Sequence, residues 1–277
     1  MSSALRSLRE AVAHYEAGDP WSARGATEAA LHAAQPNEHE PFAEALLLMA
    51  NICAAEGDLV TAERYAATCS GYVDEHLGPQ HSGAAVVRLN RAVFMLEGYR
   101  LAGSSDILLV EKAHALLIEA ERFLTNVCGV SRLVLAEVLH NSGVCLSLLG
   151  RYVAALTAYM RSMQIRVRFK DAAGVTDLRL ALTMEHVALL YRLMGGPKRQ
   201  EAALLMEVVA STRRRLLGPQ HPLWAAAVLA QGVIAAELGQ RSRAQSFLRG
   251  ASVALSSHYG EESPEAQYAV KLLVSVA

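Results

Sequence analysis

The sequence predicts an all-α fold, an array of about six stacked helical hairpins followed by one C-terminal helix. The composition is 52% hydrophobic but only 6% aromatic, with 19% charged residues, which is typical of helices rich in Ala and Leu. Pairs of small residues recur along the chain around a turn glycine. Between them apolar residues repeat at intervals of three, four and seven, and no alternating strand pattern occurs.

The paired small residues mark the point where the two helices of a hairpin are expected to cross. Two helices approach closely only where their facing residues lack bulk, and a glycine between them supplies the left-handed turn that ends the first helix. In four hairpins the pair is twelve positions apart, as Ala11 and Ala23 around Gly18, Ala50 and Ala62 around Gly57, Gly143 and Ala155 around Gly150, and Gly232 and Ala244 around Gly239.

Two further hairpins carry insertions at the tip. The third pairs Ala92 with Ala113 and is nine residues longer, centred on Gly103. The fifth pairs Ala188 with Ala202 and is two residues longer. The longer insertion adds several apolar side chains, which suggests either a second docking surface or packing onto the next repeat. The residues concerned are Tyr99, Arg100, Ile107, Leu108 and Leu109.

The hairpins follow one another with a period of 42 residues. A leader, Leu-Gly-Pro-Gln-His, occurs at 77–81 and again at 217–221. In it Gly ends a helix, Pro prevents its continuation, and His begins the next one. We therefore expect residues 1–277 to form a single solenoid. Its hairpins cover about residues 3–34, 40–76, 82–127, 131–169, 175–216 and 221–257, and its last helix covers about 263–276.

The last helix has an unusual composition for the end of an array. A terminal helix is expected to present a polar outer face. Residues 272–274 and 276–277 are all apolar and leave little polar surface. The helix is therefore expected to dock on a partner or on the groove of the array.

These hairpins resemble tetratricopeptide repeats, and the 42-residue period with its Leu-Gly-Pro-x-His leader resembles the kinesin light chain type. The spacing excludes the 34-residue form, and a HEAT or armadillo array would not keep the small residues twelve apart. The heptad coiled coil that precedes the repeats in kinesin light chains is absent. The resemblance implies a right-handed superhelical TPR solenoid whose first helices line a concave groove for an extended peptide or a partner helix.

The resemblance also implies where a peptide would bind. In kinesin light chain repeats, asparagines commonly stand two and three residues before the first small residue, where an amide can hydrogen-bond a peptide backbone. Here the middle of the array keeps polar residues, and the candidates for the peptide or partner groove are Asn90, His140, Asn141, Glu185 and His186. The sixth hairpin has Leu229 and Ala230 instead, which favours an apolar contact. Alternatively, Asn141 or His186 bonds only a neighbouring helix.

Charge is distributed unevenly although the net charge is −1. Residues 1–78 hold four Lys or Arg against twelve Asp or Glu, whereas residues 150–257 hold fifteen against six. Basic residues recur on equivalent second helices, which stacking would place side by side in a basic strip suited to acidic peptides, acidic tubulin tails or an RNA backbone. The strip comprises Arg161, Arg166, Arg168, Lys170, Arg213, Arg214, Arg215, Arg241 and Arg243.

Two other interpretations of these charges remain open. The arginines are either solvated or paired with nearby glutamates, or the acidic end of one copy meets the basic end of another. Few aromatic residues lie among the arginines, so RNA contact would be electrostatic rather than sequence-specific.

No enzymatic motif occurs. The ten histidines are scattered, and neither a metal-binding His or Cys cluster, a phosphate loop nor a Gly-x-Ser-x-Gly turn is present. The four cysteines lack C-x-x-C spacing, which favours reduced thiols. The sequence therefore predicts a protein that is not an enzyme and needs no cofactor or metal.

The predicted location is intracellular, most simply cytoplasmic. No apolar run reaches the ~18 to 20 residues needed to span a bilayer, and charged residues at Arg6, Arg9 and Glu10 interrupt the start, so membrane insertion and secretion are not expected. A mitochondrial matrix presequence is the alternative, against which Glu10 and Glu16 argue.

The predicted function is a non-catalytic protein–protein interaction scaffold, a subunit of a larger complex that binds a peptide or a partner helix. The alternative is a structural subunit of a ribonucleoprotein or cytoskeletal assembly that contacts RNA or acidic tails through the basic strip. An apolar groove contact should change little with salt, whereas phosphate binding should weaken steeply.

Overall fold

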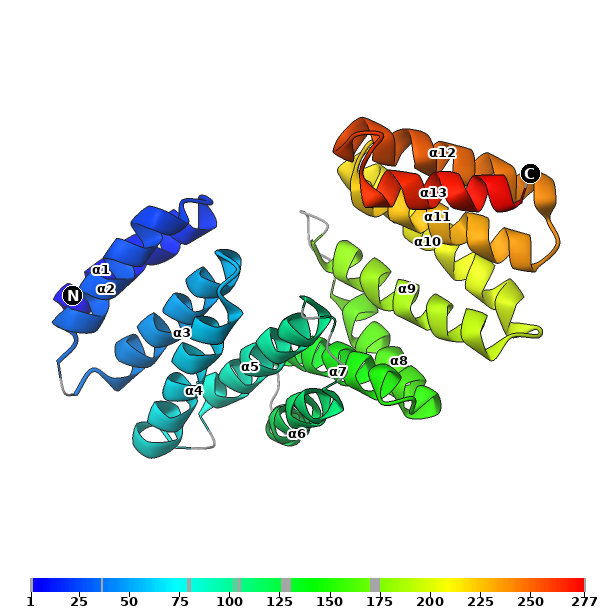
Figure 1. Ribbon diagram of the computed structural model, residues 1–277. Helices are drawn as coiled ribbons and strands as arrows, with labels where there is room; N and C mark the ends of the chain where they lie inside the picture. The colour runs from blue at the N-terminus through cyan, green and yellow to red at the C-terminus, as the bar shows by residue number, and fades with distance from the viewer. Residues whose placement is uncertain are drawn as a thin grey trace. The chain divides into compact units, whose positions relative to one another are not determined.

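The chain folds into paired α-helices (Figure 1). The computed structural model describes residues 2–35, 37–78, 81–101, 103, 106–125, 131–169 and 175–276. Within these ranges it has thirteen α-helices and no strand, which confirms the all-α fold class. Contacts divide the chain into two compact units, Met1–Arg151 (unit 1) and Tyr152–Ala277 (unit 2), and each is described by itself.

Unit 1 contains three hairpins and a further helix. In each hairpin the two helices pack against each other, and the second helix also contacts the first helix of the next hairpin. The hairpins are α1 (Ser3–Glu16) with α2 (Pro20–Ala33), α3 (His39–Ala55) with α4 (Leu59–His76), and α5 (Ser82–Leu101) with α6 (Ile107–Leu124); the further helix is α7 (Ser131–Leu148).

Unit 2 repeats the same arrangement. Its first helix, α8 (Tyr152–Arg168), contacts α9 (Val175–Met194), which pairs with α10 (Lys198–Leu217). The next hairpin consists of α11 (Pro222–Glu237) and α12 (Arg241–Tyr259), and α13 (Pro264–Ser275) packs on α12. Buried Ala266 and Ala269 face into this last contact, while the apolar side chains of Val270 and Val274 are exposed.

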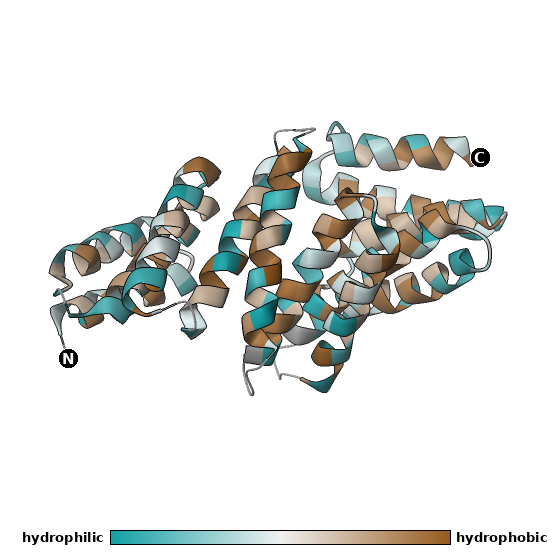
Figure 2. Cartoon of the chain, turned by 90° about the horizontal axis from the view of Figure 1, so that it is seen from below, coloured by the Kyte–Doolittle hydropathy of each residue, from teal (hydrophilic) through white to brown (hydrophobic). Residues whose placement is uncertain are grey.

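The predicted helix crossings form the core. Every alanine of the paired small residues is 0% exposed, as expected for residues where packed helices cross. These residues are Ala11, Ala23, Ala50, Ala62, Ala92, Ala113, Ala155, Ala188, Ala202 and Ala244. The helices carry both hydrophobic and hydrophilic residues around their circumference, as Figure 2 shows, so burial at the crossings leaves a polar face outside. No helix in the described ranges combines the length and hydropathy of a membrane span.

Helix starts and turns use the residues that the sequence marks. The turn residue Gly57 has a φ of 85°, a left-handed conformation that side chains other than glycine rarely adopt. Asp58 then caps α4, its Oδ1 accepting a hydrogen bond from the Thr61 amide at 3.0 Å. In the leaders, His81 and His221 accept hydrogen bonds through Nδ1 from the amides two residues later, at 3.2 and 3.1 Å. The repeated histidine therefore begins a helix.

The insertion in the third hairpin lengthens both helices. Helix α5 continues nine residues beyond Ala92, whereas α3 continues only five beyond Ala50. Helix α6 begins six residues before Ala113. Leu101, Ile107 and Leu108 are exposed at this tip, and the two serines at its centre lie outside the described residues.

Acidification should weaken unit 1 through His114 of α6. Burial and the positive charge of Arg151 hold the pKa of His114 below its ordinary value of 6.5, although Glu121 opposes this shift. The folded state therefore favours neutral His114, and the stability this contributes is complete above pH ~6.5 and is lost as pH falls through the lowered folded pKa. His114→Gln should reduce the amount by which the urea midpoint of unfolding falls between pH 7 and pH 5. The control is His258→Gln, which removes an exposed histidine of unit 2; an unchanged drop in His114→Gln would contradict the prediction.

Candidate functional site

The candidate groove residues of unit 1 have hydrogen bonds within the unit. Asn90 of α5 donates from Nδ2 to Oδ1 of Asn51 on α3, over 3.0 Å, and so joins two adjacent hairpins. Asn141 of α7 donates to the carbonyl oxygen of Glu137 on the same helix, over 2.9 Å. Its neighbour His140 is buried. Contact of these side chains with a peptide stays a prediction.

The two candidate groove residues of unit 2 lie side by side on α9 but have different surroundings. The His186 ring is half-buried, with Nδ1 2.9 Å from the Leu182 carbonyl oxygen and the ring centroid 5.4 Å from that of Tyr159 on α8. The Glu185 side chain instead points to α10, the second helix of its own hairpin. There it contacts Arg213, which was predicted for the basic strip.

Glu185 and Arg213 form a buried, two-pronged ion pair. The Arg213 Nη2 and Nη1 atoms donate to the two Glu185 carboxylate oxygens over 2.7 and 3.1 Å. Nη1 also donates to the Leu223 carbonyl oxygen over 3.0 Å, so one guanidinium joins α9, α10 and α11. The side chains are only 4% and 18% exposed, for Arg213 and Glu185 respectively. The sequence predicted Glu185 for the peptide groove and Arg213 for the basic strip. In the structure the two side chains bind each other, so neither charge is free to contact a partner.

Burial also removes Arg166 from an exposed strip. Arg166 stands eleven residues after Ala155, the same position in α8 that Arg213 holds in α10 relative to Ala202. Its side chain is buried, and Nε donates to Ser162 Oγ over 3.3 Å. Two of the recurring arginines, Arg166 and Arg213, therefore lie at a buried position of their helices rather than on an outer face.

The other predicted strip residues are at the surface, and several already have partners. Arg215 pairs with Asp177 and Arg243 with Glu207, at 2.8 and 2.9 Å. Arg241 donates to the Val276 carbonyl oxygen at the end of α13 over 3.0 Å. Arg161, Arg168 and Arg214 are exposed, and Lys170 lies outside the described residues. The positive charge of the strip is therefore partly neutralised within the unit.

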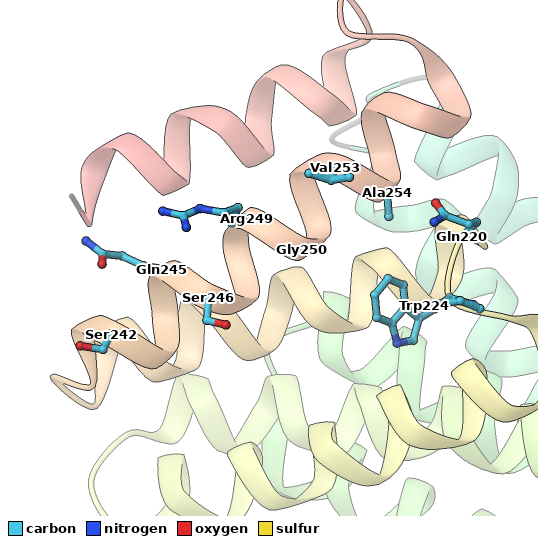
Figure 3. Close-up of a pocket in the computed structure, with 10 residues that line it drawn as sticks. Gln220, Trp224, Ser242, Gln245, Ser246, Arg249, Gly250, Val253 and Ala254 are labelled. Atoms are coloured by element: carbon cyan, nitrogen blue, oxygen red, sulfur yellow. The ribbon is translucent and has the colours of Figure 1, made fainter.

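Unit 2 contains a groove of about 550 Å³ along α12. Figure 3 shows its lining residues following α12 from Ser242 to Ala254, with Trp224 of α11 at one end. Ser242, Ser246 and Gly250 line the groove and, at a spacing of four residues, lie on one face of α12. Their small side chains leave the groove deep along this face. Arg249 has no ion-pair partner among the described residues of the unit.

Sequence reasoning missed this groove. None of the residues that line it was predicted as a site, neither Trp224 and Arg249 nor the small residues beside them. The fourfold spacing of small residues on α12 was a signal, but small residues at this spacing equally mark a buried helix contact.

The described cysteines are buried in the helical core. Cys53, Cys69 and Cys145 are buried free thiols, and Cys128 lies outside the described residues. Burial raises the pKa of Cys69 and of Cys145 to about 12, so neither thiol ionises appreciably near neutral pH. Among the described residues no group of three His, Cys, Asp or Glu side chains is placed to hold a metal ion.

Comparison with known proteins identifies the fold through structure rather than sequence. No family model matches the chain, and no curated protein matches it. A putative kinesin light chain from Podosopora anserina, solved as nearly identical TPR-like repeats, superposes with a TM-score of 0.59 at 16% identity, covering 77% of this chain and 94% of that one. PilF of Pseudomonas aeruginosa gives a TM-score of 0.64 at 16% identity and 96% coverage of each chain.

A third solved structure resembles nearly the whole chain. A Rap protein complexed with Competence and Sporulation Factor gives a TM-score of 0.62 at 12% identity, covering 99% of this chain and 74% of that one. At such low identities the likeness shows the fold alone. With the buried small-residue crossings, it shows that this chain is an all-α repeat solenoid with the fold of tetratricopeptide-repeat proteins.

Proposed function

We propose that the chain is a non-catalytic protein-interaction scaffold that holds a peptide or a partner helix as a subunit of a larger complex. The observation that carries the proposal is the groove along α12, which combines an aromatic side chain, several small residues and an arginine with no ion-pair partner among the described residues. A segment with an apolar residue and an acidic residue would satisfy both Trp224 and Arg249.

Two further observations support the proposal. The similar Rap structure contains a bound factor, so this fold accommodates a partner molecule. Partnered arginines also weaken the case for RNA, because Arg213, Arg215 and Arg243 already bind carboxylates within the unit. Phosphate binding would have to displace those ion pairs, whereas the α12 groove is open. Asn90, His140 and Asn141 of unit 1 and, separately, His186 of unit 2 remain proposed contacts for a peptide.

Co-purification tests the proposal. Tagged full-length protein would be isolated from its own cells at low and high salt, with and without nuclease, and the retained proteins identified by mass spectrometry. We expect a stable set that survives both treatments. Arg249→Glu should deplete that set at least about fivefold, because a reversed charge repels an acidic partner.

The matched control is Arg214→Glu, which reverses an exposed arginine outside the groove and should retain the set. Equal depletion by both variants, or by neither, would place the contact elsewhere. Loss of all partners on nuclease treatment would contradict the scaffold proposal and favour the ribonucleoprotein alternative.

A further inference from the structure

Unit 1 contains a second cavity, of about 220 Å³, between its second and third hairpins. Its apolar lining includes the partly exposed Leu47 of α3 and two almost fully buried residues, Val73 of α4 and Val87 of α5, each 1% exposed. Its rim carries two carboxylates one helical turn apart, Glu40 and Glu44. The cavity therefore joins a hydrophobic interior to an acidic entrance.

The corresponding place in unit 2 shows what such a junction can hold. The hairpins on either side of each junction are joined by the same leader, Leu-Gly-Pro-Gln-His, so the two junctions can be aligned residue by residue. Val73 stands eleven residues after Ala62, as Arg213 stands after Ala202. Leu47 stands three residues before Ala50, as Glu185 stands before Ala188.

The same junction is thus filled in unit 2 and open in unit 1. In unit 2 the Arg213 guanidinium occupies it, held by Glu185 and by the Leu223 carbonyl oxygen. In unit 1 the shorter Val73 cannot reach across, and Leu47 supplies no charge. A cavity therefore lies at the junction whose counterpart in unit 2 holds the Arg213 side chain.

The acidic entrance provides the charge that the interior lacks. Glu44 is exposed and has no ion-pair partner among the described residues of the unit. Glu40 lies close to a leader residue, with Oε1 3.3 Å from His81 Nε2. The first 78 residues hold four Lys or Arg against twelve Asp or Glu, so the surrounding field favours a cation.

We propose that this cavity binds an arginine side chain of a basic peptide segment, with its alkyl stem against the partly exposed Leu47 and its guanidinium on the Glu44 carboxylate. Arginine suits the site because its stem is apolar, its charge persists when partly desolvated, and its fork can bind a carboxylate through two hydrogen bonds. The inference deepens the proposed scaffold function, since it names the chemistry of one partner.

A peptide titration tests the proposal. The probe is the acetylated and amidated pentapeptide Ala-Gly-Arg-Ala-Gly, with lysine and citrulline versions. Full-length protein with labelled Leu and Val methyl groups would be followed by NMR. We expect the arginine peptide to shift the methyl signals of Leu47, Val73 and Val87 in a saturable way. Citrulline keeps the shape but lacks the charge and should bind about tenfold more weakly.

Two variants sharpen the test. Glu44→Gln should weaken the arginine peptide about threefold to tenfold, since it removes the charge but not the shape. The control Glu111→Gln changes an exposed carboxylate of α6 outside the cavity and should leave the affinity unchanged.

Leu47→Glu combined with Val73→Arg copies the unit 2 pair into unit 1 and should abolish binding by filling the cavity from within. If that double variant does not fold, Glu44→Gln still decides.

The proposal is overturned if the citrulline or lysine peptide binds as tightly as the arginine peptide, if Glu44→Gln has no effect, or if the shifts occur away from the cavity. Such a result would leave the scaffold function intact provided that the salt- and nuclease-resistant protein set is still retained. Loss of that set would count against the scaffold function instead.

Discussion

Replacing Glu185 with leucine should lower the free energy of unfolding of unit 2 by about 3 to 5 kcal/mol. The substitution leaves Arg213 charged, 4% exposed and without its carboxylate, in a place where water cannot fully solvate it. The remaining hydrogen bond to the Leu223 carbonyl oxygen does not neutralise the charge. Hydrogen exchange of backbone amides, measured at increasing urea concentrations, would separate the stability of unit 2 from that of unit 1.

The matched control replaces both partners. Glu185→Leu with Arg213→Val installs the residue pair that the chain itself uses at the equivalent junction in unit 1, Leu47 and Val73. We expect the double variant to recover most of the loss, because removing both charges also removes the cost of burying them. A double variant as unstable as Glu185→Leu would mean that the guanidinium contributes mainly by filling space.

Replacing Gly232 with alanine should destabilise unit 2 by about 2 kcal/mol, although alanine is the better helix former by about 1 kcal/mol. A Cβ atom at Gly232 would lie 2.6 Å from Leu248 Cγ and 3.3 Å from its backbone nitrogen. Leu248 is itself buried, so the contact can be relieved only by moving α11 away from α12. Chemical denaturation of the full chain would measure the loss.

Gly250→Ala is the control for the same hairpin. A Cβ atom there would meet nothing within 4 Å, and Gly250 has ordinary helical geometry. That substitution should therefore stabilise the protein by about 0.5 to 1 kcal/mol. If both variants were stabilising, helix propensity rather than the crossing would govern Gly232.

Sequence periodicity was a strong guide to the helices because it reflects local requirements. The paired alanines are buried at every crossing, the turn residue Gly57 adopts the left-handed conformation, and the leader histidines cap helix starts. Each of these properties depends on residues within about one helical turn or at a fixed separation in the repeat. A repeated local rule is visible in a single chain.

Side-chain partners were harder to predict because they depend on which neighbour lies opposite. Arg166 and Arg213 look like strip residues in the sequence, since they recur on equivalent helices. The structure buries both, and Arg213 reaches the first helix of the next hairpin, where it donates to the Leu223 carbonyl oxygen. A sequence records the recurrence of arginine but not the direction of its side chain.

The sequence by itself determined the all-α repeat fold, the places where helices cross and the residues that start and end them. Only the tertiary structure decided that Glu185 binds Arg213, that the equivalent junction around Val73 is an open cavity, and that Trp224 and Arg249 share a groove. The physical reason is distance along the chain. Helix formation and turning are decided by neighbouring residues, whereas an ion pair or a cavity requires side chains from helices many residues apart to meet.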